Sequence, residues 1–198
     1  VDDFVWDGVP ITISRTGYTG EDGFEILVDA NQAVKLWDVI MKSNERDGLL
    51  PAGLGARNTL RLEACLLLYG NDMDESVTPL ETTIDWTVKF DKGNFIGREA
   101  LLRQRERGIA RRLVGFEMID RGIPRQDYPV FLGSEAIGKV TSGSFSPSTN
   151  KNIGLCLIKS HAAQTGNEIH IQIRDNKYKA QIVKTPFYTR EITHEHTK

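Results

Sequence analysis

The apolar residues of this 198-residue chain change their spacing after Ala110. Before that point, apolar side chains follow the i, i+3, i+4, i+7 spacing that is typical of one buried helix face, at Ala33, Leu36, Trp37, Ile40 and Met41. After it, Ile169, Ile171 and Ile173 alternate with polar residues, as in a strand with one buried face. The sequence therefore predicts an α+β chain whose last part is an all-β barrel or sandwich.

Turn residues and spacing together predict the order of the elements. Two strands, Pro10–Ser14 and Phe24–Val28, flank a glycine-rich turn, and Ile84–Phe90 fits either a strand or a short buried segment. A first helix is expected after Asp29 or Asn31, ending at Gly48, and further helices are expected at 54–67 and 97–107. Later strand-like segments lie near 114–118, 129–132, 136–142, 152–158, 169–173 and 178–182. We expect four parts: 1–90, a connector helix in 91–110, a β domain at 111–190 and a tail at 191–198.

Composition and charge exclude several classes of protein. A net charge of −2 gives no strong attraction to nucleic acid or to an anionic membrane, and no apolar run approaches the ~20 residues of a membrane helix. Cys65 and Cys156 lie in apolar runs without metal-ligand spacing, which predicts buried free thiols in a reducing compartment. Asp72, Asp74 and Glu75 lack the spacing of a calcium loop, so we expect a solvated loop without a metal.

One glycine-rich stretch is the strongest candidate for a binding site. Three glycines fall within Gly17–Gly23, which lets the backbone turn sharply and approach a ligand closely. Tyr18 offers a flat face with a hydroxyl, and the carboxylate of Glu25 can accept two parallel N–H donors. The pair suits a flat, donor-rich heterocycle such as a pterin. The alternative is a tight hairpin with a surface carboxylate.

Five sequence blocks resemble, in order and spacing, the aminomethyltransferase (T-protein) family of the glycine cleavage system. They are SRTGYTGEDGFEI (14–26), PAGLGARNTLRLEACLLLYGND (51–72), WTVKFDKGNFIGREAL (86–101), LVGFEMIDRGIPRQDYPVF (113–131) and GKVTSGSFSPSTNKNIGLCLI (138–158). The resemblance implies the C-terminal part of the family's sequence: part of a folate-binding α/β domain, followed by a C-terminal β-barrel domain. It also implies that the family's catalytic aspartate lies outside this chain, so the chain alone is expected to be inactive.

The resemblance further implies a reaction and site residues. The family transfers a methylene group from the aminomethyl-lipoyl arm of H-protein to tetrahydrofolate and releases ammonia. Glu25 is expected to receive the pterin ring, and Tyr18 to stack on the folate or bond near its reacting nitrogens. Arg57 is expected to bind folate or aminomethyl-lipoate, and Tyr188 to close over the folate. The alternatives are a turn-packing role for Tyr18 and a structural ion pair for Arg57, which is the class expected for Arg61.

The sequence also leaves two alternative functions open. The folate-binding tail of a dimethylglycine or sarcosine dehydrogenase is one alternative, and a non-catalytic folate-binding relative is another. Trp86 is expected in the core, and the alternative is a position flanking the folate cavity. The hydroxyl-rich run Ser142–Pro147 has no histidine and acid at a triad spacing, and Gly20–Gly23 lacks the P-loop lysine, so neither a serine hydrolase nor a nucleotide-binding loop is predicted. The expected compartment is the cytoplasm for a bacterial chain and the mitochondrial matrix for a eukaryotic one.

Overall fold

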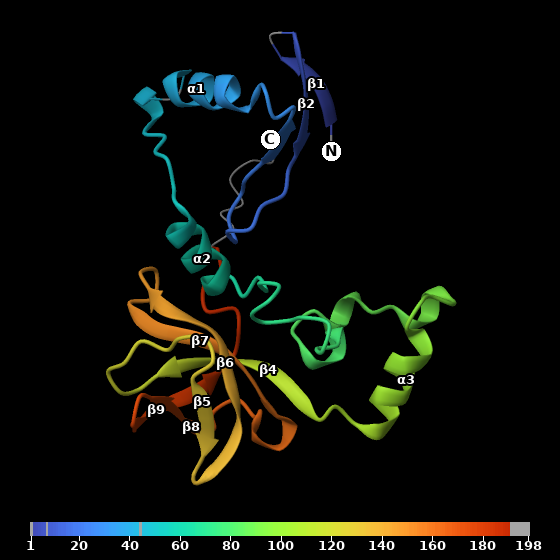
Figure 1. Cartoon of the computed structure of the whole chain (residues 1–198), viewed down its shortest axis with the longest axis vertical. Helices are drawn as coiled ribbons and strands as arrows, with labels where there is room; N and C mark the ends of the chain where they lie inside the picture. Colours follow the sequence, from blue (N-terminus) through green and yellow to red (C-terminus); the bar gives the residue numbers. More distant parts are fainter. Residues whose placement is uncertain (1, 7, 44, 191–198) are drawn as a thin grey trace, which may run out of the picture. The chain divides into compact units, whose positions relative to one another are not determined.

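The computed structural model describes residues 2–6, 8–43 and 45–190, so the predicted tail at 191–198 lies outside the described residues (Figure 1). The described residues divide into two compact units: those up to Arg61 together with Arg190, and Leu62–Thr189. The first unit contains a three-stranded antiparallel sheet in the order β1-β2-β3, together with α1, a short 3-10 turn and α2 as far as Arg61. The bounds are β1 (Asp2–Trp6), β2 (Val9–Ser14), β3 (Glu25–Val28), α1 (Ala33–Ser43), the turn Glu45–Asp47 and α2 (Leu54–Glu63).

Helix α1 faces one side of this sheet. Phe4, Ile11 and Val28 are cross-strand partners and therefore share a face. A cavity of about 270 Å³ between helix and sheet is lined by Trp6, Ile11, Ile26, Leu36, Val39, Ile40 and Ser43. The prediction that Trp37 belongs to the buried helix face is wrong, because Leu36, Val39 and Ile40 take that side and Trp37 is 55% exposed.

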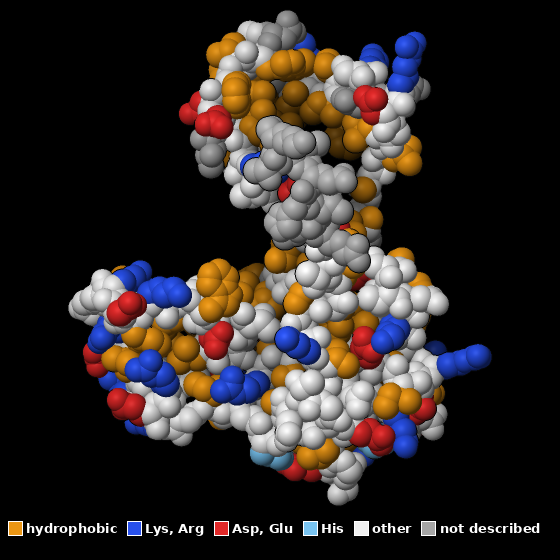
Figure 2. Space-filling model, turned by 180° about the vertical axis from the view of Figure 1, so that it is seen from behind, with side chains coloured by type: hydrophobic (Ala, Val, Ile, Leu, Met, Phe, Trp, Pro, Cys, Tyr) orange, Lys and Arg blue, Asp and Glu red, His pale blue; other side chains and the backbone are white. Residues whose placement is uncertain are grey.

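The first unit covers little of its own apolar surface. Among its described residues, the buried apolar side chains are Val9, Ile11 and Leu36. Large apolar side chains that stay exposed include Phe4, Val5, Phe24, Leu27, Val34, Trp37, Leu50 and Leu54. Figure 2 shows hydrophobic side chains gathered in the hollow of this unit, at the top of the view. A core this thin contributes little to stability, because hydrophobic stabilisation scales with the apolar area removed from water.

The second unit is built on a closed six-stranded antiparallel barrel in the order β4-β7-β6-β5-β8-β9. The strands are β4 (Arg111–Met118), β5 (Pro129–Leu132), β6 (Glu135–Ser146), β7 (Lys151–Lys159), β8 (Glu168–Ile173) and β9 (Asn176–Val183). The predicted alternation is confirmed, since Ile169 and Ile171 are fully buried in the barrel core beside Phe116, Val130 and Ile182. The chain is thus α+β, and its β part is a barrel.

Strand β7 is buried on both faces. Cys156 and Ile158 point into the barrel core, whereas Leu155 and Leu157 join a second apolar cluster with Leu62. Leu67, Leu113 and Ile153 complete that second cluster, and Phe187 packs against it. The continuous apolar run of β7 is explained by this double burial, which is typical of strands covered on both sides.

The stretch between α2 and the barrel departs from expectation in three places. The helix expected at 54–67 ends at Glu63, and Ile84–Phe90 is neither a strand nor buried. It forms 3-10 turns at Asp85–Thr87 and Phe90–Lys92, in which the Thr87 N–H donates to the Ile84 carbonyl and the Lys92 N–H to the Lys89 carbonyl. Trp86, expected in the core, is 67% exposed.

Two further elements complete this stretch, a 3-10 turn at Pro79–Glu81 and α3 (Arg98–Arg107). The charged helix expected at 97–107 is confirmed as α3, with Gly97 preceding it in the left-handed conformation. The predicted part boundaries at 90 and 110 stay a prediction. Over the described residues, every helix is too short or too polar to cross a lipid bilayer.

Candidate functional site

Pairing of β2 with β3 sets the position of Glu25. Ser14 lies opposite Glu25, so residues 15–24 form the connecting loop and Glu25 is the first residue after it. Cross-strand partners share a face, which places Glu25 with Thr12 and Leu27 on the side of the sheet opposite α1. The exposed carboxylate of Glu25 accepts a hydrogen bond from the Thr16 hydroxyl. The loop thus presents an exposed, oriented carboxylate at its end.

Tyr18 and Arg57 are brought together from distant parts of the sequence. The guanidinium carbon of Arg57 lies 4.7 Å from the centroid of the Tyr18 ring, which is within the range of a cation–π contact. Arg57 lies in the first turn of α2, where its N–H bonds the Gly53 carbonyl. The helix N-terminus adds positive potential at this point. The described contact of Arg57 is therefore an aromatic ring, which differs from the carboxylate pair considered as the alternative.

Ion pairs stabilise the same loop. Nη1 of Arg190 lies 2.6 Å from a carboxylate oxygen of Asp22, and Nη2 of Arg15 lies 3.5 Å from it. Arg190 also approaches Glu21 at 3.7 Å. The hydrogen bond from Arg190, aided by its charge and by Arg15, lowers the pKa of Asp22 below its usual value. Sequence reasoning missed Arg190, since no local pattern links it to a loop more than 160 residues earlier.

Arg61 is buried, but its described bonds go to a neutral amide, whereas a structural ion pair was expected. Its side chain is 2% exposed, and its Nε and Nη2 both donate to the Asn58 side-chain oxygen, at 2.9 and 2.8 Å. A buried guanidinium that is bonded within its own helix is oriented by the fold. Arg57, one turn earlier and exposed, is the arginine of α2 that a ligand can reach.

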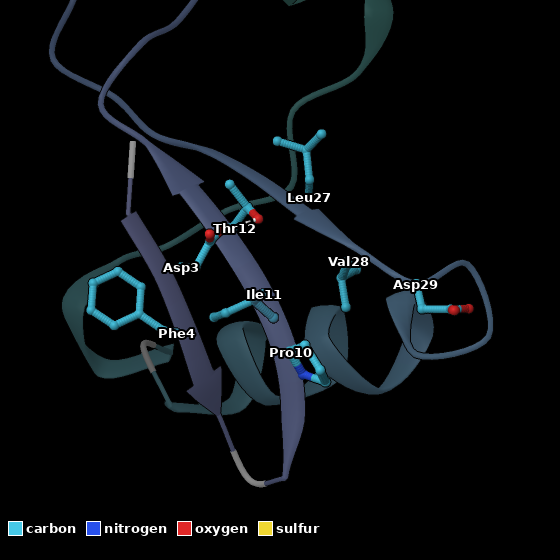
Figure 3. Close-up of a pocket in the computed structure, with 8 residues that line it drawn as sticks. All are labelled: Asp3, Phe4, Pro10, Ile11, Thr12, Leu27, Val28 and Asp29. Carbon is cyan, nitrogen blue, oxygen red and sulfur yellow. Dashed lines mark hydrogen bonds between the residues drawn. The ribbon is translucent and has the colours of Figure 1, made fainter.

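A shallow hollow of about 470 Å³ lies on the first unit's sheet (Figure 3). Its lining residues are Asp3, Phe4, Pro10, Ile11, Thr12, Leu27, Val28 and Asp29. The Asp3 carboxylate already accepts a 2.6 Å hydrogen bond from Thr12, and the two side chains lie close together in the close-up (Figure 3). None of the predicted ligand-binding residues is in this lining, so we assign the candidate site to the loop with Tyr18 and Glu25.

Tyr188 belongs to the second unit and is described with it. Its backbone N–H donates to the Glu63 carbonyl at 3.0 Å, and its side chain is half-buried. Phe187, directly before it, packs against the second apolar cluster. Tyr188 is therefore held at its backbone, while its expected role over the folate stays a prediction.

The sequence analysis did not predict the burial of three acids, Asp72, Glu63 and Glu81. Asp72, expected in a solvated loop, is 1% exposed and accepts hydrogen bonds from the Thr141 and Ser142 hydroxyls and the Leu68 N–H. Glu63 is 2% exposed and accepts bonds from the Ser146–Ser148 turn. The hydroxyl-rich run Ser142–Pro147, for which no catalytic triad was predicted, provides donors to Asp72 and Glu63 together with its neighbours Thr141 and Ser148. Of the two cysteines expected to be buried, Cys156 is buried and Cys65 is partly exposed.

Comparison with known proteins agrees with this architecture. The GCVT N-terminal domain family matches residues 1–92, and the glycine cleavage T-protein C-terminal barrel domain matches residues 111–189. The chain is 56% identical to an aminomethyltransferase of Thermoanaerobacter pseudethanolicus over 91% of its length, and 54% identical to one of Bacillus pumilus over 91%. The chain belongs to the aminomethyltransferase (T-protein) family of the glycine cleavage system.

A solved structure supports the T-protein assignment. The crystal structure of glycine cleavage system aminomethyltransferase T from Bartonella henselae matches 92% of the chain with a TM-score of 0.83 and 32% identity. The chain spans about half the length of the curated T-protein relatives it matches, 49% of the Thermoanaerobacter protein and 50% of the Bacillus protein. These relatives carry the name aminomethyltransferase, which favours the T-protein reading over a dehydrogenase tail.

Proposed function

We propose that this chain forms part of a tetrahydrofolate-dependent aminomethyltransferase. The enzyme transfers the methylene carbon of an aminomethyl group, carried on the lipoyl sulfur of H-protein, to tetrahydrofolate. The observation that supports this best is the loop at 15–24, which is followed directly by the exposed carboxylate of Glu25 and whose Tyr18 ring lies against the Arg57 guanidinium. A flat aromatic face, a cation and a two-oxygen acceptor within one unit suit a pterin ring with its attached acid groups.

In the proposed reaction, nitrogens of tetrahydrofolate attack the methylene carbon. Ammonia and the lipoyl thiolate leave, and the carbon becomes bonded to both folate nitrogens. Such a reaction depends on holding two bound reactants in a near-attack geometry, with a carboxylate nearby for proton transfer. The resemblance assigns that carboxylate to an aspartate outside this chain. The residues present here would therefore bind and orient the reactants.

Each site residue has a distinct proposed role. Glu25 accepts the exocyclic amine and a ring N–H of the pterin, because a carboxylate can accept two parallel charge-assisted bonds. Tyr18 stacks on the folate, and Arg57 binds folate or aminomethyl-lipoate. Tyr188 closes over the folate. A compartment in the cytoplasm for a bacterial chain, or the mitochondrial matrix for a eukaryotic one, stays a prediction.

The test is the Glu25→Gln substitution, made in a chain of the family's full length that contains this sequence. The substitution turns one acceptor oxygen into a donor, so one pterin donor would face another. A bond to a charged group is worth roughly 1.5–3 kcal/mol, so tetrahydrofolate affinity should fall about 10- to 150-fold by calorimetry. The melting temperature should not change, because Gln retains an oxygen for Thr16.

Glu21→Gln is the matched control for this experiment. It makes the same change of charge in the same loop, at an exposed residue next to the Arg190 pair. It should leave folate affinity close to that of the parent. If Glu25→Gln and Glu21→Gln bind tetrahydrofolate equally well, Glu25 is a surface carboxylate and the proposed pterin contact is wrong.

A further inference from the structure

Glu63 is a buried acid to which the proposed reaction gives no role. It is the last residue of α2 and is 2% exposed. Its Oε1 accepts hydrogen bonds from the Ser146 hydroxyl at 2.6 Å and the Ser148 N–H at 3.1 Å, and its Oε2 accepts one from the Ser148 hydroxyl at 2.7 Å. Three donors on one carboxylate hold the Glu63 side chain in a single position, against the turn between β6 and β7.

The backbone of the same residue holds Tyr188. The last carbonyls of a helix have no partner within the helix, so they need donors from elsewhere. The Glu63 carbonyl takes its donor from the N–H of Tyr188, at 3.0 Å. Glu63 is therefore the residue at which the end of α2, the β6–β7 turn and the segment 185–188 meet.

The segment before Tyr188 lies tightly on the barrel. Gly115, in β4, is a point of close approach: a Cβ built there would lie 2.2 Å from Cγ2 of Thr185 and 3.0 Å from Cζ of Phe187. Phe187 packs against the apolar cluster that contains Leu62. The segment is thus fixed on one side by packing, and Tyr188 is fixed at its N–H by Glu63.

We propose that Glu63 is a positioning residue for Tyr188. Its carboxylate, held by Ser146 and Ser148, fixes the carbonyl that binds the Tyr188 amide, and this sets where the Tyr188 ring can meet the folate. The last step rests on the proposed function of Tyr188. Glu63 itself is enclosed by protein donors and does not contact substrate.

Amide hydrogen exchange in the full 198-residue chain tests the anchor directly. Glu63→Ala should speed exchange at the Tyr188 amide about tenfold relative to the amides of β7, the factor that corresponds to the loss of one hydrogen bond. Glu63→Gln should stay close to the parent, because its oxygen can accept the Ser148 N–H while its amide donates to the Ser148 hydroxyl. Where Glu63→Ala does not fold, Ser148→Ala removes one of the three contacts of the Glu63 side chain, the hydroxyl bond to Oε2, and should show the same local effect more weakly.

Glu81→Ala is the matched control. Glu81 is also a buried acid, 5% exposed, and it accepts bonds from the Thr78 N–H and from Arg111 at 2.8 Å. If Glu81 has only a structural role, Glu81→Ala should speed amide exchange throughout the barrel, with no larger effect at the Tyr188 amide than elsewhere. If the Glu63 and Glu81 variants, compared at equal loss of stability, change Tyr188 exchange equally, the positioning role is wrong.

A second measurement separates this inference from the proposed function. In a chain of the family's full length, Tyr188→Ala and Glu63→Ala should both lower tetrahydrofolate affinity, and the double variant should bind no more weakly than Tyr188→Ala, since coupled residues are not additive. If Tyr188→Ala leaves affinity unchanged, the folate role of Tyr188 is wrong. If Tyr188→Ala weakens binding but the Glu63 effect simply adds to it, Glu63 does not act through Tyr188.

Discussion

Replacing Asp72 by alanine should destabilise the barrel unit strongly. The carboxylate is 1% exposed and accepts bonds from the Leu68 N–H at 2.9 Å, the Thr141 hydroxyl at 2.6 Å and the Ser142 hydroxyl at 2.7 Å. Pairing of β6 with β7 shifts register between Val140 and Ser142, and this irregularity lets consecutive hydroxyls reach one acceptor. In a regular strand, neighbouring side chains point to opposite faces.

The magnitude follows from the donors that lose this acceptor. The Thr141 hydroxyl keeps a second acceptor, the Leu155 carbonyl at 3.2 Å. The bonds from the Leu68 N–H and the Ser142 hydroxyl to the Asp72 carboxylate are both lost, at about 1–3 kcal/mol for each. The free energy of unfolding should therefore fall by about 2–6 kcal/mol. At about 4 °C per kcal/mol, the melting temperature should drop by roughly 8 °C or more.

Thermal melts of the 198-residue chain, followed by circular dichroism, measure this loss. Asp74→Ala is the matched control, because Asp74 is exposed and its carboxylate bonds only locally, to the Ser76 N–H at 2.7 Å and hydroxyl at 2.6 Å. Asp72→Asn should give an intermediate result, since its oxygen still accepts both hydroxyls while its amide faces the Leu68 N–H. An Asp72→Ala chain that melts together with the Asp74→Ala chain would refute the reasoning.

Two further predictions concern the thiols and the loop charges. Burial raises the pKa of the Cys156 thiol far above its usual value, so iodoacetamide should modify the partly exposed Cys65 first and Cys156 only on unfolding. Peptide mass spectrometry measures both modifications, and equal rates of modification of the two thiols in the folded chain would contradict this prediction. The Arg190 pair lowers the pKa of Asp22, so its stabilising effect is present above the usual aspartate pKa and is lost as pH falls through the lowered value. Arg190→Gln should raise the Asp22 pKa in an NMR titration. An unchanged pKa would show that Arg190 does not cause the lowering.

The candidate site was only partly predictable. Glycine spacing and residue type pointed to Tyr18 and Glu25, because a close-approach turn is a local property of the chain. The contact between Tyr18 and Arg57 spans 39 positions, and the ion pair between Asp22 and Arg190 spans more than 160. Contacts at such separation leave no local spacing in a single sequence, since the fold alone brings the partners together.

By itself, the sequence determined the class of the chain and most of its elements. Alternating apolar residues specify half-buried strands wherever they occur, so the barrel strands followed from residues such as Ile169 and Ile171. Tertiary structure decided which polar groups are buried. Asp72 and Asp74 are two positions apart in one acidic stretch, yet only Asp72 lies beneath β6, where hydroxyl donors replace its water. Burial depends on what packs over a residue, and that is a property of the whole fold.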